Sequence, residues 1–260
     1  MRIALTGAAS GIGAACAAIL KKNGAEVVGF DIAEPTKNVD RWIPVDMSDP
    51  APISQAVSQA DGKFDALLNI AGLPPREGLT HRILTVNYFG LVAFTEAVLG
   101  QLNAGSAIVN LASRAGSHWQ ENIDQVKAFM ALDGWADGQL DGFIENQSID
   151  PTRAYHLSKE AVIVWTISQT ERLIARDLRM NSVSPSAVAT GILDDFIKAF
   201  GDRATQSLAR AGRAGTPEEV AALVTFLAHP DSNWLKGNDI LIDGGMSSMV
   251  LADSFELNDG

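Results

Sequence analysis

Cysteine is almost missing from this chain of 260 residues, since Cys16 is the only one. A single thiol excludes an internal disulfide framework and any zinc site that needs several cysteines. The histidines also lack the spacing of metal ligands, so we assign no role to His81, His118, His156 and His229. The chain is nevertheless long enough to bury a large hydrophobic core without a disulfide or a metal.

Basic residues are scarce as well, with 20 Lys and Arg against 31 Asp and Glu and a net charge of −11. Such a chain is a poor nucleic-acid binder, because phosphates require clustered cations, and anionic lipid repels it. Long apolar runs are missing too: residues 220–228 fall far short of the ~20 residues of a spanning helix. The first strand also follows Met1 too closely for a signal peptide. We therefore expect a soluble, cytoplasmic protein whose partners include neither nucleic acid nor a membrane.

Hydrophobic residues make up 47% of the chain, in short apolar runs that alternate with longer periodic segments. The short runs predict strands at 2–6, 26–31, 42–45, 64–70, 106–111, 180–184 and 239–242. The periodic segments predict helices at 12–22, 51–59, 86–102, 152–177 and 217–228. Continuously apolar strands are typical of a parallel sheet with helices on both faces. The alternation predicts one α/β domain over residues 1–260, a Rossmann-type doubly wound parallel sheet.

Two segments lie outside this alternation. Residues 115–150 form an insert before the helix at 152–177, and their apolar residues recur at helical spacing. We expect one or two amphipathic helices there rather than an irregular loop. Residues 189–212 carry an apolar stripe at 192–200, which predicts a lid over a bulky hydrophobic substrate. An ordinary amphipathic surface helix is the alternative.

A glycine-rich turn, Thr6-Gly7-Ala8-Ala9-Ser10-Gly11-Ile12-Gly13, follows the first strand and opens the first helix. It lets backbone N–H groups approach a pyrophosphate at the helix N-terminus, although a purely structural turn would look similar. Asp31 ends the second strand, where a carboxylate can bind the adenosine ribose diol and repel the 2′-phosphate of NADP. Ile32 supplies no compensating cation. The pattern favours NAD, with an ordinary strand-end turn as the alternative interpretation of Asp31.

Tyr155 and Lys159 are four residues apart in a predicted helix and therefore project from the same face. A phenol with a pKa of about 10 needs a fall of about 2–3 pH units to act as a base near neutrality. An adjacent ammonium supplies part of that fall, and the positive charge of an oxidised nicotinamide adds to it. The alternative is an exposed helical tyrosine beside a solvated lysine.

Several motifs, taken in order, resemble the short-chain dehydrogenase/reductase family across nearly the whole chain. They are the glycine turn at 6–13, Asn69-Ile70-Ala71-Gly72, Asn87, Ser113, Tyr155 with Lys159, Pro185-Ser186-Ala187-Val188-Ala189-Thr190, and Ile242-Asp243-Gly244-Gly245. The resemblance implies that Tyr155 is the catalytic acid/base and that Ser113 binds the substrate oxygen. It implies that Lys159 lowers the pKa of Tyr155 and binds the nicotinamide ribose, and that Asn87 holds a water of a proton relay. It implies cofactor contacts from Tyr155, Lys159 and the following residues: Gly7, Ser10, Gly11, Ile12, Gly13, Asp31, Asp46, Met47, Asn69, Ala71, Gly72, Pro185, Val188 and Thr190.

Two of these residues have simpler explanations. Ser113 can be a strand-end turn residue, and Asn87 can be a buried polar group bonded to the backbone. We expect Tyr88, the other tyrosine, to pack in the core.

The spacing departs from the family pattern in two places. Only 14 residues separate Gly72 from Asn87, fewer than is usual, whereas Ser113 and Tyr155 are 42 positions apart because of the insert. With these two departures in spacing, the chain resembles a bacterial subgroup that includes 3α-hydroxysteroid dehydrogenase/carbonyl reductase and coniferyl alcohol dehydrogenase. In the proteins it resembles, an insert at this position packs over helices that otherwise form the common tetramer interface, so of a homodimer and a homotetramer we favour the dimer. We also expect Trp119 to wall the substrate pocket.

These patterns predict an NAD-dependent alcohol dehydrogenase/carbonyl reductase. The substrate expected is a small hydrophobic or aromatic alcohol or ketone, of hydroxysteroid or coniferyl/cinnamyl type. One alternative is a non-catalytic NAD-binding regulator, which could dispense with the serine, tyrosine or lysine that this chain retains. Another is a sugar-nucleotide epimerase or dehydratase, which usually adds a C-terminal substrate domain. An enoyl reductase is disfavoured by the Tyr155–Lys159 spacing.

Overall fold

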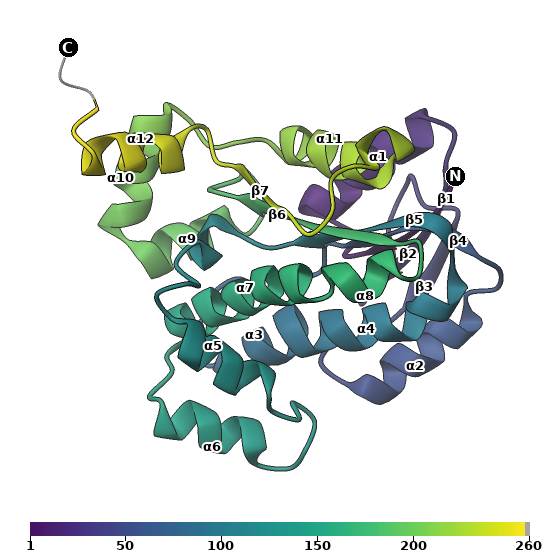
Figure 1. Cartoon of the computed structure of the whole chain (residues 1–260), viewed down its shortest axis with the longest axis horizontal. Helices are drawn as coiled ribbons and strands as arrows, with labels where there is room; N and C mark the ends of the chain where they lie inside the picture. Colours follow the sequence, from purple (N-terminus) through teal and green to yellow (C-terminus); the bar gives the residue numbers. More distant parts are fainter. Residues whose placement is uncertain (258–260) are drawn as a thin grey trace.

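Seven strands form one parallel sheet in the order β3-β2-β1-β4-β5-β6-β7 (Figure 1). The computed structural model describes residues 1–257, and its strands are β1 (Arg2–Thr6), β2 (Glu26–Asp31), β3 (Arg41–Pro44), β4 (Phe64–Asn69), β5 (Leu102–Leu111), β6 (Arg179–Pro185) and β7 (Asp239–Ile242). The strand order reverses between β1 and β4, the point at which doubly wound sheets bind ligands. The predicted fold class is confirmed.

Helices cover both faces of the sheet, which is why its strands are almost continuously apolar. On one face lie α1 (Gly11–Lys22) and α11 (Pro217–Ala228), which pack against each other. The other face carries α2 (Pro50–Gln59), α4 (Leu91–Val98), α7 (Pro151–Ser168) and α8 (Thr170–Ile174) (Figure 1). Side chains of β1 alternate between two cores, with Ile3 and Leu5 facing α1 and α11 and Ala4 facing the other layer.

The helix predicted at 86–102 begins earlier than expected. α3 (Thr80–Leu84), the π-helical turn η1 (Thr85–Gly90), α4 and the 3-10 turn η2 (Leu99–Gln101) form one continuous stretch, after which Leu102 begins β5. This stretch of 22 residues is long and apolar enough by composition to cross a membrane, but 72% of its most apolar window is buried inside the protein. Such burial is typical of a core helix. Its full length is not evident from the sequence, because polar residues interrupt the apolar runs.

The helix predicted at 152–177 is divided into α7 and α8. Asp150 caps α7 by accepting a hydrogen bond from the Arg153 backbone N–H at 2.6 Å, and Pro151 occupies the first turn. The chain leaves α8 through Asp177, whose φ of +54° reverses its direction before β6. These local signals place α7 across the carboxyl half of β5 and β6.

The insert is helical, as predicted, and contains the 3-10 turn η3 (Arg114–Gly116), α5 (Ile123–Met130) and α6 (Gln139–Asn146). α5 packs on α7 and α6 packs on α3, so the insert lies outside the helical layer (Figure 1). Phe89 of η1 meets Phe129 and Trp135 of the insert with ring centroids 5.0 and 6.3 Å apart. Gly134 lies so close to the Phe89 ring that a Cβ there would overlap it.

Residues 189–212 also form helices, α9 (Leu193–Phe200) and α10 (Asp202–Ala211), joined at Gly201 with a φ of +54°. The sequence analysis did not predict α12 (Met246–Ser254) or the 3-10 turn η4 (Pro230–Ser232). In α12 the apolar residues Met249, Val250 and Leu251 are consecutive, so no helical stripe marks the segment.

Candidate active site

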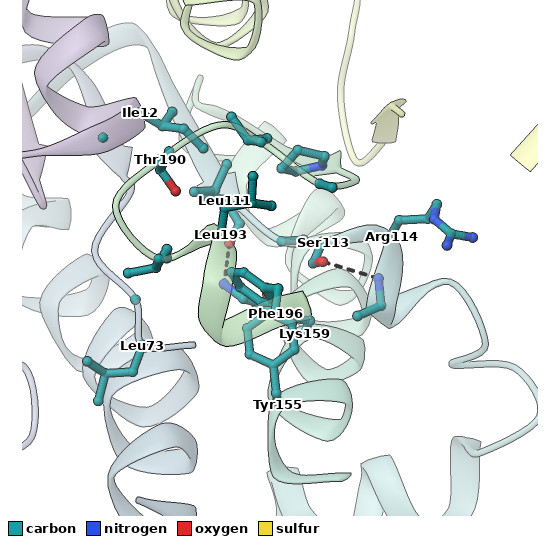
Figure 2. A pocket seen from close by; sticks show the side chains of 18 of the residues that line it. Ile12, Leu73, Leu111, Ser113, Arg114, Tyr155, Lys159, Thr190, Leu193 and Phe196 are labelled. Atoms are coloured by element: carbon teal, nitrogen blue, oxygen red, sulfur yellow. Dashed lines mark hydrogen bonds between the residues drawn. The ribbon is translucent and has the colours of Figure 1, made fainter. Parts of the chain in front are cut away.

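A cavity of about 810 Å³ opens at the carboxyl edge of the sheet. The segments that follow six successive strands of the chain all reach it: the glycine turn after β1, Asp31 at the end of β2, residues 45–47 after β3, 70–73 after β4, 111–115 after β5 and 185–188 after β6. Side chains of α7 and α9 (Figure 2), together with those of α10 and α12, complete its wall. Carboxyl ends of parallel strands converge on one edge, which explains how motifs far apart in the sequence meet here.

The glycine turn has no room for side chains. Gly7 has a φ of +71°, and a Cβ there would lie 2.7 Å from the Ala71 backbone N. A Cβ on Gly13 would overlap the Gly7 carbonyl oxygen. Ser10 precedes α1 in an extended conformation and its side chain makes no capping bond, which leaves the first N–H groups of α1 for a ligand. This cradle fits the pyrophosphate of a dinucleotide.

Asp31 lines the cavity beside the glycine turn. Its two carboxylate oxygens accept hydrogen bonds from Ala9 N at 2.9 Å and Ala33 N at 3.0 Å, so the residue also organises the turn. A carboxylate has about four acceptor sites, so a ribose diol can still bind. Ile32 is 70% exposed and brings no cation.

Asp46 and Met47 also line the cavity, as the resemblance implied. Burial raises the pKa of Asp46, but two hydrogen bonds from Ser48 and the Arg82 guanidinium outweigh it and hold that pKa below its usual value. The Arg82 guanidinium lies 3.2 Å from the carboxylate. This end of the cavity is therefore lined by a stable anion and its partner cation.

Asn69 is not among the residues that line the cavity. Its side-chain amide donates to Thr95 Oγ1 and to Asn110 Oδ1, both at 2.9 Å, inside the layer between the sheet and its helices. The Asn69 side chain therefore points into this layer, and a contact between Asn69 and the cofactor stays a prediction. Its neighbours Ala71 and Gly72 do line the cavity.

Ser113, Tyr155 and Lys159 meet at the cavity wall (Figure 2). Ser113 follows β5 and its hydroxyl accepts a hydrogen bond from Ala115 N at 3.1 Å. Tyr155 and Lys159 project from one face of α7, with the Lys159 Nζ 5.9 Å from the centre of the phenol ring. All three residues are buried, with 9%, 6% and 4% of their surface exposed. The predicted trio is therefore brought together, and the alternative of a solvated Tyr–Lys pair is wrong.

Burial controls the ionisation of this pair. It raises the pKa of Tyr155 to about 12, an effect that the Ser113 hydroxyl partly opposes. It also lowers the pKa of Lys159 to about 8, because desolvation penalises the ammonium. The sequence predicted a lowered phenol pKa, but in this structure removal from water is the largest effect on the pKa of Tyr155 and raises it.

Asn87 lies in η1 and is fully buried. Its side-chain oxygen accepts from Leu73 N at 2.7 Å, and its amide donates to Leu73 O at 3.0 Å and to Ser158 Oγ at 3.3 Å. A Cβ on Gly72 would lie 3.2 Å from the Asn87 oxygen and 3.6 Å from Lys159 Nζ, so Gly72 separates the two. The Asn87 side chain therefore agrees with the interpretation of a buried polar group bonded to the backbone. The role of Asn87 in a proton relay stays a prediction.

The segment after β6 forms the opposite wall. Pro185, Val188 and Thr190 line the cavity, and the Thr190 methyl lies 3.4 Å from the position of a Cβ on Gly11. The apolar stripe of this segment faces inward, and Phe196 meets the Tyr155 ring edge-on at 5.1 Å. Arg76, in the loop after β4, donates to both carboxylate oxygens of Asp195 in α9 at 2.9 and 2.7 Å.

Sequence reasoning missed several lining residues. Ser117, His118 and His156 line the cavity, as do Met246 and Val250 of the unpredicted α12. His156 adjoins Tyr155, but the 100° turn between neighbouring helix positions made it an unpromising candidate. Trp119, expected at the substrate pocket, packs against the hydrophobic core instead and does not line the cavity.

A parallel doubly wound sheet with this cradle and this buried trio defines a dinucleotide-binding oxidoreductase. The family model described as "Enoyl-(Acyl carrier protein) reductase" matches residues 7–131 and 141–247. The coniferyl-alcohol dehydrogenase of Pseudomonas sp. (strain HR199 / DSM 7063) is 36% identical over 249 residues, which cover 95% of this chain and 96% of the relative. The chain therefore belongs to the short-chain dehydrogenase/reductase family.

Two further proteins are similar over their whole length. The 3-alpha-hydroxysteroid dehydrogenase/carbonyl reductase of Comamonas testosteroni is 28% identical over 262 residues, which cover 97% of this chain and 99% of the relative. The 3-alpha-hydroxysteroid dehydrogenase of Pseudomonas sp. B-0831, solved in complex with NADH, superposes with a TM-score of 0.80 and 29% sequence identity. The match covers 97% of this chain and 99% of that protein. This chain is accordingly an alcohol dehydrogenase/reductase of the short-chain type, a family that uses a nicotinamide cofactor.

Proposed function

We propose that this enzyme uses NAD to interconvert a hydrophobic or aromatic alcohol, of hydroxysteroid or coniferyl/cinnamyl type, and its carbonyl compound. The observation that carries the proposal is the Tyr155 phenol, which lies beside Ser113 on one side of the cavity and meets the Phe196 ring at 5.1 Å on the other. An apolar body can contact the aromatic wall while its carbinol reaches the phenol. Relatives named for coniferyl alcohol and 3-alpha-hydroxysteroids agree with an alcohol of this kind.

NAD is the proposed cofactor because Asp31 places a carboxylate where the 2′-phosphate of NADP would lie. The nearest lining cation at this end, Arg82, is already paired with Asp46. The related 3-alpha-hydroxysteroid dehydrogenase was solved with NADH, which is consistent with this choice. The glycine cradle would hold the pyrophosphate, and the segment from Pro185 to Thr190 would lie over the nicotinamide.

The chain's own residues would handle the proton. A bound nicotinamide supplies the hydride acceptor for oxidation and the hydride donor for reduction. Tyr155 would take the hydroxyl proton in oxidation and return it in reduction, while Ser113 holds the substrate oxygen. The Lys159 ammonium would stabilise the phenolate and bind the nicotinamide ribose, and Asn87 would hold a relay water. Closure of α9 over the cavity would exclude water and fix the alcohol against Tyr155.

Two other activities fit less well. A non-catalytic regulator has no need for a buried lysine whose pKa is lowered to about 8 next to a buried tyrosine. The description of the family model names an enoyl reductase, but the spacing of Tyr155 and Lys159 and the named relatives favour alcohol chemistry.

We also propose that the protein is a cytoplasmic homodimer. The insert covers α7 and α3, which removes those helices from contact with a second copy. Apolar residues are exposed instead on β7, on the loop before it and on α11, with Leu241 at 44%, Trp234 at 94% and Phe226 at 45%. Light scattering tests the proposal, and a tetramer assembled through α7 would refute it.

The deciding experiment compares NAD with NADP across hydroxysteroids, cinnamyl alcohols and simple secondary alcohols. We expect NAD-dependent oxidation of at least one hydrophobic class, with little turnover of short aliphatic alcohols. Strong preference for NADP would overturn the role of Asp31. No turnover of any alcohol, with NAD bound, would overturn the proposed function.

A further inference from the structure

His156 lies on the same wall of the cavity as the Tyr155 phenol. It follows Tyr155 in α7 and lines the cavity. Its ring stacks on Phe200 with centroids 5.3 Å apart and planes 6° from parallel. Phe200 also lies 6.3 Å from the Tyr155 ring and 6.1 Å from Phe196. The imidazole therefore continues the aromatic surface that begins at the phenol.

The ring nitrogens of His156 have no hydrogen-bond partner among residues 1–257. The nearby acid is already satisfied: one Glu160 oxygen accepts from Arg153 at 2.7 Å and the other from Asn122 at 2.7 Å. Burial, followed by the charge of Arg153, lowers the pKa of His156 below its usual value, so the ring is neutral at pH 7. A neutral imidazole carries one donor and one acceptor, and both remain available to a ligand in the cavity.

Neither His156 nitrogen is among the fully buried polar atoms that lack a partner in residues 1–257, so both are accessible to water or to a polar group of a ligand in the cavity. Phe200 covers one face of the ring, whereas Arg153, Glu160, His118 and Asp150 lie close enough to act on its charge. The part of a ligand that reaches His156 is therefore expected to combine a flat apolar ring with a polar group. A hydroxyl on an aromatic ring meets both requirements, since it can donate to or accept from the imidazole while its ring packs on Phe200.

We propose that His156 is a specificity-determining residue that hydrogen-bonds a second hydroxyl of the substrate, carried on an aromatic ring remote from the carbinol. The proposal rests on the function proposed above and narrows it from hydrophobic alcohols in general to phenolic ones. The insert contributes to the surroundings of His156, because Asn122 binds the nearby Glu160 carboxylate.

The test measures kcat/KM with NAD for 4-hydroxycinnamyl alcohol and for cinnamyl alcohol, which differ only in the ring hydroxyl. The wild type is expected to prefer the hydroxylated alcohol at least tenfold, because an unpaired polar group disfavours the analogue without it. His156→Phe keeps a flat ring against Phe200 but removes both nitrogens, and it should lower that preference about tenfold or more. His156→Gln, which retains a donor and an acceptor, should keep part of it.

His81→Phe is the matched control, since His81 lies in α3 with its side chain 50% exposed and should leave the preference unchanged. Circular dichroism and NAD affinity establish that each variant is folded, and His156→Leu, which also lacks hydrogen-bonding groups, replaces the Phe variant if that one is not. A wild type that oxidises both alcohols equally, or a His156→Phe variant that loses both activities in the same proportion, would overturn the inference and leave the proposed function intact. Oxidation of hydroxysteroids but neither cinnamyl alcohol would also overturn it, whereas no turnover of any alcohol refutes the proposed function itself.

Discussion

Lys159 donates a hydrogen bond from its Nζ to the carbonyl oxygen of Leu111 at 2.8 Å (Figure 2). This bond joins the middle of α7 to the end of β5, two residues before Ser113. Gly116, in the turn η3 that follows β5, permits η3 to approach α7, because a Cβ there would lie 2.7 Å from the Lys159 carbonyl carbon. The ammonium and the serine hydroxyl are therefore held at the cavity by one packed junction rather than by separate loops.

The first prediction concerns the phenol. Tyr155→Phe should lower kcat for alcohol oxidation by about 10²–10⁴-fold while NAD affinity stays close to that of the wild type, because only the proton-transferring oxygen is removed. Steady-state kinetics and NAD titration measure both quantities. Tyr88→Phe is the matched control, since Tyr88 is buried but does not line the cavity. Near-normal turnover by the Tyr155→Phe variant would remove Tyr155 from the mechanism.

The second prediction concerns stability and pH. A lysine pKa that falls from 10.5 to about 8 on folding corresponds to about 3 kcal/mol of destabilisation. This penalty is complete below pH 8, where both states are protonated, and it disappears as the pH rises towards 10.5 because only the unfolded state still binds the proton. Lys159→Met removes the titration, so its free energy of unfolding relative to the wild type should fall as the pH rises from 7 to 10.

Urea unfolding at several pH values, without cofactor, measures that difference. Lys127→Met, at an exposed position of α5, serves as the control and should show no such trend. A stability difference between Lys159→Met and the wild type that does not change with pH would contradict a lowered lysine pKa.

The third prediction concerns the choice of cofactor. Asp31→Asn keeps the shape and an acceptor for the turn but removes the negative charge. The ratio of kcat/KM for NAD over NADP should fall roughly 10- to 100-fold, because repulsion of the 2′-phosphate is relieved. Asp61→Asn, whose side chain is 91% exposed outside the cavity, should not alter the ratio. An unchanged ratio in Asp31→Asn would reduce Asp31 to an organiser of the turn.

The fourth prediction concerns the ion pair between the β4 loop and α9. Arg76→Gln removes the two hydrogen bonds to Asp195, so α9 should close less firmly and KM for the alcohol should rise about two- to fivefold. High salt should raise the wild-type KM in the same direction, since exposed pairs are screened. Arg172→Gln is the control, because Arg172 binds Glu96 with the same two-bond geometry away from the cavity. Equal KM values for the alcohol in the Arg76→Gln and Arg172→Gln variants would show that the Arg76–Asp195 ion pair does not affect substrate binding.

Local sequence predicted the elements best where one physical signal dominated. The strands were identified because burial on both faces requires continuous apolar runs, and α7 could be placed from Pro151 and the tyrosine–lysine spacing. The stretch from Thr80 to Gln101 was harder, because a helix that begins with polar residues and contains a π-helical turn has no regular stripe. α12 was missed for the same reason.

Side-chain direction was beyond local sequence. Asn69 belongs to a motif at the cavity edge, but its amide points into the layer between sheet and helices because Thr95 and Asn110 offer partners there. The 100° turn between neighbouring helix positions predicts that His156 points away from Tyr155, yet Phe200 of α9 stacks on its ring and His156 lines the cavity. Both outcomes depend on elements distant in the sequence.

By itself the sequence determined the class of fold, the glycine cradle, the acid at position 31 and the tyrosine–lysine pair, because each depends on neighbours within a few residues. Only the tertiary structure decided which of these groups share a cavity, that burial raises the pKa of Tyr155, and that His156 belongs to the aromatic wall. The reason is physical: desolvation and hydrogen-bond partners are set by packing between α7, β5, α9 and the insert, and that packing exists only when the whole chain is folded.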